Sequence, residues 1–184
     1  MRKVVVAILA ILLSSTIALA QKPQKASDIL KAAQNKATEQ NKSILLIFGA
    51  SWCEACHQLD IFFALPEIAP IIDQHFVVAH VIFGEGAAGH PDWDTPGSDV
   101  LVTKYGGLSA SGRVNIPFIA VMDAKARLLA NSGEATKKDK ESTGFPNDPA
   151  EIKEFLAMLQ KGAPMLTAED VHKLENGLHE AAAD

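Results

Sequence analysis

The chain has very little cysteine, because only Cys53 and Cys56 occur among its 184 residues. Two cysteines are too few for the disulfide framework of a small secreted scaffold. Their close spacing would close a very short loop, and in the chain-entropy model a bridge over so short a loop adds little stability. The pair therefore points to chemistry on sulfur rather than to a structural crosslink.

The chain also lacks an excess of positive charge and a second long hydrophobic run. It has 17 Lys and Arg against 22 Asp and Glu, a net charge of −5, which argues against binding to nucleic acid or to an anionic membrane surface. Beyond the N-terminal segment, the apolar run at 76–83 is far too short to span a bilayer. The sequence shows no serine triad pattern, no phosphate-binding glycine loop and no paired catalytic carboxylates. We expect no nucleic-acid partner and no membrane span once the N-terminal segment is removed.

The N-terminus has the pattern of a secretory signal peptide. Basic residues at 2–3 precede an apolar run at 4–13, and small residues end in Ala-Leu-Ala at 18–20. These are a basic n-region, an apolar h-region and an A-x-A cleavage site. The alternative, an uncleaved membrane anchor, is disfavoured by the polar residues at 14–16. We predict cleavage after Ala20 and a periplasmic or secreted protein.

The rest of the chain alternates between helical and strand patterns. Apolar periodicity and capping residues predict helices at 27–41, 53–65, 67–74, 97–105, 149–162 and from 167 onward, with strands at 44–48, 76–83, 117–122 and 127–130. Alternating helices and strands favour a parallel sheet core, while the last two strands are close enough to form a hairpin. The predicted class is α/β, with a central mixed sheet that has a parallel core and a C-terminal β-hairpin, flanked by helices.

Single residues predict some boundaries and faces. Ser27 is expected to cap the first helix, and Asp148 with Glu151 three residues later predicts a capping box. In the fourth helix, Val100, Leu101 and Tyr105 are expected to face inward.

The last helix is an addition with a narrow apolar stripe formed by Val171, Leu174 and Leu178. We interpret the stripe as a contact with the domain rather than with a second copy, so we expect a monomer. The predicted organisation is a signal peptide at 1–20, one domain at 21–163 and a C-terminal helical extension at 164–184.

The stretch 44–57 organises the rest of the chain. A continuously apolar run, typical of a strand covered on both faces, ends at Gly49, and Trp52-Cys53 follows after a short turn and opens a helix. Unpaired N–H groups and peptide dipoles at a helix N-terminus favour a thiolate, which is the form that attacks disulfides. This arrangement predicts a reactive cysteine.

Two motifs in this chain resemble those of the thioredoxin-like superfamily. Trp52-Cys53-Glu54-Ala55-Cys56 resembles the W-C-x-x-C active site, and Asn115-Ile116-Pro117 before a strand resembles the cis-proline loop. The element order also matches, over roughly 26–161. The chain is most similar to exported, single-domain bacterial members, and the resemblance implies a thioredoxin-like fold.

The resemblance also implies roles for individual residues. Cys53 would be the exposed nucleophile that forms a mixed disulfide, and Cys56, more buried, would resolve it. Trp52 would shield the disulfide. Ile116 and a cis Pro117 would shape the site, with their loop backbone pairing with the substrate chain. The implied reaction is dithiol–disulfide exchange without a cofactor, on protein thiols or disulfides, with a membrane-bound or exported redox partner.

The chain departs from ordinary thioredoxins at two positions. Glu54 stands beside the first cysteine, where its charge disfavours the thiolate, so we expect a reductase rather than a strong oxidase. Thioredoxins carry a buried acid six residues before the first cysteine, whereas this chain has Ile47 there. Glu54, Asp60 or Glu85 could replace that acid through water, and the sequence does not select among them.

The residues Cys53-Glu54-Ala55-Cys56-His57 also match the C-x-x-C-H pattern of c-type haem attachment. In this alternative the chain is an exported haem-binding electron-transfer protein with His57 as an iron ligand. The opposite ligand would be a methionine: Met122, Met158 or Met165. A buried strand leading into the motif argues against it, and Ile116-Pro117 would have no role.

Three further alternatives stay open. A zinc site could form from Cys53, Cys56, His57 and another histidine. One C-x-x-C alone is weak evidence for such a site, and we predict no metal. The chain could be a non-catalytic thioredoxin-fold binding module with an inert disulfide. His57 is either a solvent-facing helix residue or a residue that tunes the cysteines.

Two histidines outside the motif invite less specific interpretations. His80 is interpreted as an ordinary core or surface histidine. The segment 85–96 contains a cluster of residues that could form a cation site: His90, Asp92, Trp93 and Asp94. We favour the simpler interpretation that this segment is a polar loop.

Overall fold

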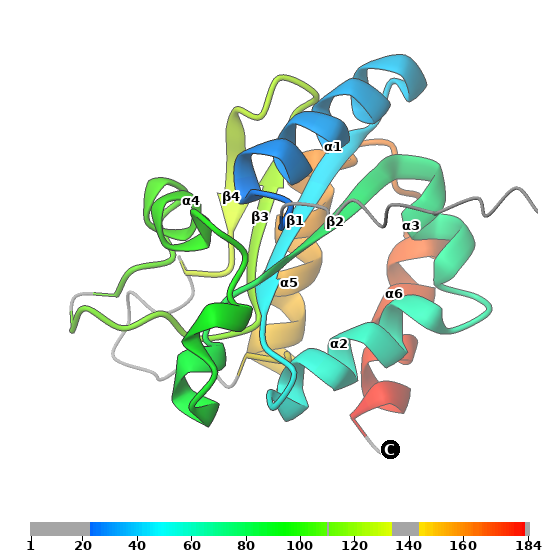
Figure 1. Ribbon diagram of the computed structural model, residues 1–184. Coiled ribbons are helices and arrows are strands. Elements are labelled where there is room, and N and C mark those ends of the chain that lie inside the picture. Colours follow the sequence, from blue (N-terminus) through cyan, green and yellow to red (C-terminus); the bar gives the residue numbers. More distant parts are fainter. Residues whose placement is uncertain (1–22, 110, 134–143, 183–184) are drawn as a thin grey trace, which may run out of the picture.

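A computed structural model describes residues 23–109, 111–133 and 144–182 (Figure 1). The predicted signal peptide lies outside the described residues. The described chain is the α/β structure that the sequence predicts, a sheet with helices on both faces.

The sheet has four strands in the order β2-β1-β3-β4. The strands are β1 (Ser43–Gly49), β2 (Phe76–Ile82), β3 (Phe118–Met122) and β4 (Leu128–Asn131). β1 pairs in parallel with β2 and antiparallel with β3, and β3 and β4 form the expected hairpin. The parallel core is therefore a single pair of strands in a mixed sheet. Residues 44–48 of β1 are buried because β1 is central and covered on both faces, as its continuously apolar sequence predicts.

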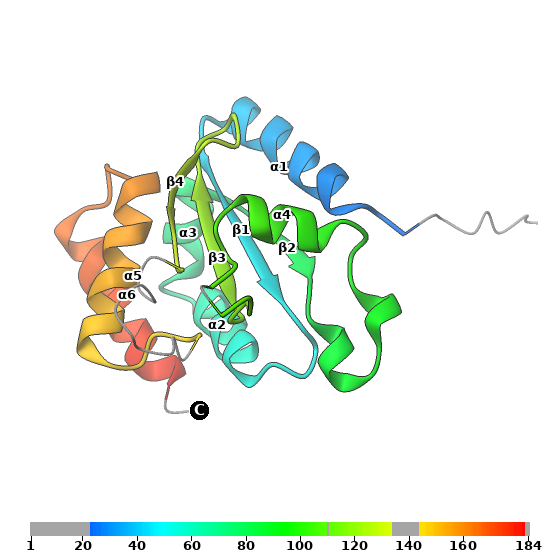
Figure 2. The ribbon, with the colours of Figure 1, turned by 90° about the vertical axis from the view of Figure 1, so that its left-hand side faces the viewer.

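Helices cover the two faces unequally, as Figure 2 shows. One face carries α1 (Ala26–Gln40) and α4 (Ser98–Lys104), and the other carries α2 (Glu54–Ala64), α3 (Ala69–His75), α5 (Pro149–Gly162) and α6 (Ala168–Ala181). Two short 3₁₀ helices, η1 (Glu85–Ala88) and η2 (Pro91–Trp93), occupy the segment predicted as a loop. Each face has its own hydrophobic cluster, with the β1 side chains alternating between them.

The N-terminus of α1 differs from the prediction. Ser27 lies inside the first turn, and Lys25 occupies the N-cap position instead. Ala26 is fully buried, and its N–H donates to Pro96 O at 3.0 Å. A contact with a distant loop therefore takes the place of the expected side-chain cap.

The buried face of α4 also differs from the prediction. Leu101 is buried as expected, but Val100 is 64% exposed and Val102 is fully buried instead. α4 has only seven residues, too few for the apolar pattern to fix its rotation, so packing against the sheet decides it.

α5 begins at the predicted cap Asp148, and α6 begins next to its predicted start at 167. The Asp148 carboxylate accepts from Ala150 N and Glu151 N, while Glu151 itself accepts from Asn147 N at 3.3 Å. α6 begins with a full capping box between Thr167 and Asp170.

α6 packs against α2 and α5 rather than standing apart. Leu174 and Leu178 are fully buried, which confirms that this stripe contacts the domain. Gly177 makes the approach possible, since a Cβ there would lie 2.8 Å from Ile68 Cδ1. The C-terminal helix is thus part of the core that supports α2.

Within the described part of the chain, no single helix is long and apolar enough to cross a membrane. α2 and α3 reach that length and apolarity only together, and the chain bends by 88° between them.

Candidate functional site

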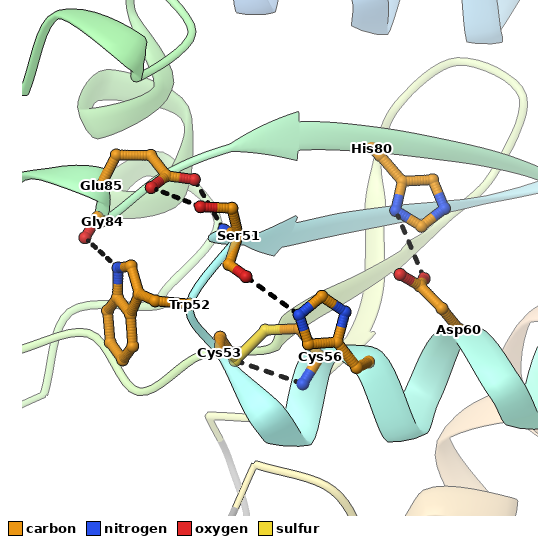
Figure 3. Close-up of a disulfide and its surroundings, with 9 residues drawn as sticks. Ser51, Trp52, Cys53, Cys56, Asp60, His80, Gly84 and Glu85 are labelled. Atoms are coloured by element: carbon orange, nitrogen blue, oxygen red, sulfur yellow. Dashed lines mark hydrogen bonds and ion pairs between the residues drawn. A yellow bond between two sulfur atoms is a disulfide. The ribbon is translucent and has the colours of Figure 1, made fainter. Parts of the chain in front are cut away.

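The two cysteines lie at the start of α2, just after the turn that follows β1 (Figure 3). Cys53 is the N-cap of α2, and Cys56 follows in its first turn. Their sulfurs form a disulfide, with a Cα–Cα distance of 5.2 Å. Cys53 Sγ also accepts from Cys56 N at 3.2 Å, so an N–H group in the first turn of the helix, which donates to Cys53 O at 3.0 Å as well, points at this sulfur. The same contact would stabilise negative charge on Cys53 Sγ in the reduced form.

The expected contrast in exposure between the two cysteines is wrong. Cys53 is 4% exposed and Cys56 is 9% exposed, so both are buried. The apolar side chains of Ala50 and Ile116 pack around them. Trp52, by contrast, is 48% exposed, and its Nε1–H donates to Gly84 O at 3.0 Å.

The cis-proline loop closes one side of the disulfide. The Ile116–Pro117 bond is cis, as the resemblance implies. Gly144, with φ +84°, lies directly against this loop, because a Cβ there would be 2.6 Å from Ile116 O and 2.8 Å from Pro117 Cδ. At the end of β1, a Cβ on Gly49 would lie 2.9 Å from Cys56 Sγ. Two glycines therefore allow backbone to approach the site closely.

A buried carboxylate holds the turn before the cysteines. Glu85 is 2% exposed, and its two oxygens accept from Ser51 N at 2.6 Å and Ser51 Oγ at 2.9 Å (Figure 3). Its own N–H donates to Asp94 Oδ1 at 2.9 Å. Because both Glu85 oxygens have donors, burial of the carboxylate is compensated. The Ser51–Glu85 pair ties the segment with the two 3₁₀ helices to the cysteine turn.

A cavity of about 230 Å³ opens on the other side of the disulfide. Its lining includes Cys56 and four ionisable side chains: His57, Asp60, His80 and Glu85. Ile47, at the position of the missing acid, also lines it. The residue opposite Ile47 on β2 is His80, whose Nδ1 is 4.0 Å from Asp60 Oδ1.

The two residues expected to tune the site are both exposed on α2, and of the two only His57 lines the cavity. Glu54 is exposed as the first residue of α2. His57 is exposed as well, and its Nε2 lies 2.9 Å from Ser51 O, to which it must donate because a carbonyl oxygen only accepts.

The other ligand hypotheses find little support in the geometry. Among the described residues, no group of three His, Cys, Asp or Glu side chains is arranged to hold a metal ion. In the segment 85–96, the His90 ring stacks on Trp93 with centroids 4.0 Å apart, and Asp94 accepts from Glu85 N. These contacts fit the polar-loop interpretation.

Sequence reasoning did not single out the structural role of Ser51, Gly144 or His80. Glu85 and Asp60 were considered only as two of three unselected acids. The sequence contained no direct signal for His80, because aligning the predicted strands 44–48 and 76–83 from their first residues pairs Ile47 with Ala79, whereas the observed register pairs it with His80. Ser51–Glu85 and Gly144–Ile116 join distant segments, and no local pattern predicts them.

Comparison with known proteins agrees with this geometry. The family model described as thioredoxin-like matches residues 25–124, which is more than half of the chain. No significant match is found among curated proteins.

Several solved structures are similar to this chain. A disulphide isomerase from Xylella fastidiosa Temecula1 is 22% identical, with a TM-score of 0.51 over 76% of this chain and 95% of that one. A DsbH oxidoreductase is 16% identical, with a TM-score of 0.44 over 84% and 94% of the two chains. A thioredoxin-fold protein from Helicobacter pylori is 16% identical, with a TM-score of 0.39 over 77% and 85%. At this level of identity the first of these structures supports the fold alone.

The sheet, the cis-proline loop and the cysteine pair at the start of α2 together define a thioredoxin-like protein. The chain belongs to the thioredoxin-like family. With its Cys53-x-x-Cys56 pair, it is a protein-disulfide oxidoreductase that carries out thiol:disulfide exchange.

Proposed function

We propose that this protein is an exported reductase of protein disulfides, with Cys53 as the nucleophile and Cys56 as the resolving cysteine. The observation that carries this proposal is the placement of Cys53 at the N-cap of α2, with its sulfur receiving the Cys56 N–H. A helix N-terminus favours the thiolate that attacks a disulfide. In the oxidised form both cysteines are buried, whereas Trp52 beside them is exposed. A substrate therefore reaches Cys53 only if Trp52 moves aside or if the substrate chain inserts next to the disulfide.

The reaction has two exchange steps. In the reduced protein, the Cys53 thiolate attacks one sulfur of a substrate disulfide, forming a mixed disulfide and releasing the other substrate sulfur as a thiolate. The Cys56 thiolate then attacks Cys53 Sγ, which forms the Cys53–Cys56 bond and releases the second substrate sulfur. The substrate disulfide gains two electrons and two protons, and the protein dithiol loses them. A partner protein that carries a dithiol must reduce the enzyme again.

The surroundings of the cysteines favour reduction over strong oxidation. Strong oxidants owe their potential to a very stable thiolate. Here Glu54 places a carboxylate next to Cys53, which disfavours that thiolate. Export rests on the basic, apolar and small-residue pattern of 1–20.

The haem alternative fits the geometry less well. Thioether attachment needs both thiols, but the sulfurs of Cys53 and Cys56 are bonded to each other. His57 Nε2–H donates to Ser51 O, so of the two ring nitrogens only Nδ1 keeps a free lone pair for iron.

Trapping of the mixed disulfide tests the mechanism. Cys56→Ser should stall the reaction with the substrate bound to Cys53, so it should give a covalent adduct with a disulfide-bonded protein that a non-reducing gel resolves. Cys53→Ser should give no adduct and no turnover, and the double variant serves as a blank. Full disulfide reductase activity in Cys53→Ser would refute the mechanism.

A redox titration separates the reductase from the non-catalytic binding module. A potential near the thioredoxin value of about −270 mV, with rapid exchange with a small dithiol, supports the reductase. A potential below roughly −300 mV with slow exchange supports an inert disulfide in a binding module.

A further inference from the structure

The cavity beside Cys56 contains groups suited to handling a proton. Ile47 and His80 are partners in the parallel register of β1 and β2, so their side chains lie on the same face of the sheet. Asp60 lies on α2 one turn after Cys56, so both side chains share a face of that helix. Cys56, Asp60 and His80 all line the cavity, whose volume of about 230 Å³ has room for several waters.

We propose that the His80–Asp60 pair is the proton acceptor for Cys56, in place of the acid that is absent at Ile47. This inference rests on the proposed function, because it concerns the step in which Cys56 resolves the mixed disulfide. The acceptor sits one strand away from the position of the missing acid, and it faces the same helix. Figure 3 shows the pair on the side of Cys56 opposite to Ser51 and Glu85.

The proposed step is balanced as follows. The Cys56 thiol gives its proton through cavity water to the His80 imidazole, and the resulting imidazolium faces the Asp60 carboxylate at 4.0 Å. The Cys56 thiolate attacks Cys53 Sγ, so the Cys53–Cys56 bond forms and the bond from Cys53 to the substrate breaks. The departing substrate thiolate takes a proton from water, and the imidazolium returns its proton to water.

The other ionisable groups that face the cavity are less suited to this role. They are His57 from α2 and Glu85 from η1. Both Glu85 oxygens already accept from Ser51. His57 is held by a neutral carbonyl, whereas His80 faces a carboxylate that stabilises an imidazolium. Glu54 does not line the cavity. An imidazole is also the side chain that ordinarily exchanges a proton near neutral pH.

Variants of this pair should fold, because the side chains are 55% and 59% exposed and a surface ion pair adds little stability. The test uses the reduced full chain without its signal peptide and an excess of a chromogenic aromatic disulfide, in a stopped-flow instrument. Attack by Cys53 releases the first aromatic thiol at a rate that depends on reagent concentration. Attack by Cys56 releases the second at a rate that does not, so the second phase isolates the proposed step.

We expect His80→Asn to slow the second phase by about tenfold or more at pH 7 and to leave the first phase unchanged. The rise of the wild-type rate near neutral pH should move toward about pH 8.5, where an ordinary thiol ionises. Asp60→Asn should give a smaller loss, because the imidazolium loses its negative neighbour. His172→Asn, on the exposed surface of α6, and Asp73→Asn, on α3, are the matched controls.

Two outcomes overturn the inference. One is a second phase of His80→Asn with the rate and pH profile of the His172→Asn control. The other is a loss that appears in His57→Asn and not in His80→Asn. Either result leaves the proposed function intact, since that function is tested separately, by the turnover of the Cys53 and Cys56 variants and by the redox titration.

Discussion

The disulfide has two unlike sides. On one side, the cis Ile116–Pro117 loop and Gly144 pack so closely that a single added Cβ would lie 2.6 Å from a backbone oxygen. On the other side, a cavity of about 230 Å³ is lined by Asp60, His80 and other polar groups. The close-packed side is suited to fixing geometry, and the open side is suited to admitting water and moving protons. Substitutions on the first side should therefore change stability, whereas substitutions of Asp60 and His80 on the second side should change rates.

Gly144→Ala should give the largest loss of stability. An alanine at φ +84° is strained, and its Cβ would collide with Ile116 O, so we expect the free energy of unfolding to fall by about 2–4 kcal/mol. Denaturant unfolding of the oxidised protein measures this fall in the free energy of unfolding. Gly89→Ala is the matched control, because Gly89 has φ +86° and its Cβ would meet no described atom within 4 Å. Equal losses in both variants would show that packing against the cis-proline loop contributes nothing.

Gly49→Ala tests the boundary between the two sides. Its Cβ would lie 2.9 Å from Cys56 Sγ, and we expect the oxidised protein to lose about 1–3 kcal/mol as the disulfide and α2 shift. Gly86→Ala, whose Cβ would make an ordinary contact of 3.7 Å with Pro91, is the control and should change stability less. Unfolding curves that coincide for the two variants would contradict the close approach.

Glu85→Gln tests the carboxylate that holds the cysteine turn. A glutamine replaces one of the two charged oxygens that accept from Ser51 with an NH2 group, so the charge-assisted hydrogen bonds of the buried carboxylate are lost and stability should fall by about 1–2 kcal/mol. Hydrogen exchange at the Ser51 amide should become faster. Asp92→Asn, exposed in the same segment, should do neither. An unchanged Ser51 exchange rate in Glu85→Gln would refute the role given to this pair.

Thr167→Ala, far from both sides, should give the smallest effect. Loss of the α6 capping box should cost about 1 kcal/mol at pH 7, with no change in either exchange phase. The Thr167 hydroxyl, followed by its N–H, holds the pKa of Asp170 below the usual 3.8. A carboxyl whose pKa is lowered by folding stabilises the folded protein at pH values above its ordinary pKa, and this stabilisation is lost as the pH falls. The difference in free energy of unfolding between wild type and Thr167→Ala should therefore become smaller below about pH 4. Unfolding at pH 7 and pH 3, with Thr103→Ala as control, measures this, and a constant difference would refute the contribution of the charge.

Much of the fold follows from local patterns. β1 is continuously apolar because it is covered on both faces, and the predicted cap Asp148 marks where α5 begins. The cysteine turn at the start of α2 follows from the W-C-x-x-C letters. These signals work because the groups that interact are only a few residues apart.

Predictions failed where a distant segment decides the outcome. α1 begins at Ala26 because that N–H bonds to Pro96 O, not because of Ser27. Cys53 is as buried as its partner because Ala50 and Ile116 pack around the pair, a contact that no helical pattern predicts.

The sequence by itself determined the class of fold, the cysteine pair and the position of that pair at a helix N-terminus. These depend on hydrophobic periodicity and capping, which operate within one turn or one strand. Only the tertiary structure decided what surrounds the sulfurs: the contact of Gly144 with the cis-proline loop, the Ser51–Glu85 pair and the cavity shared by Cys56, Asp60 and His80. Each of these depends on strand register and on the packing of segments far apart in the chain, which long-range burial fixes and no short pattern encodes.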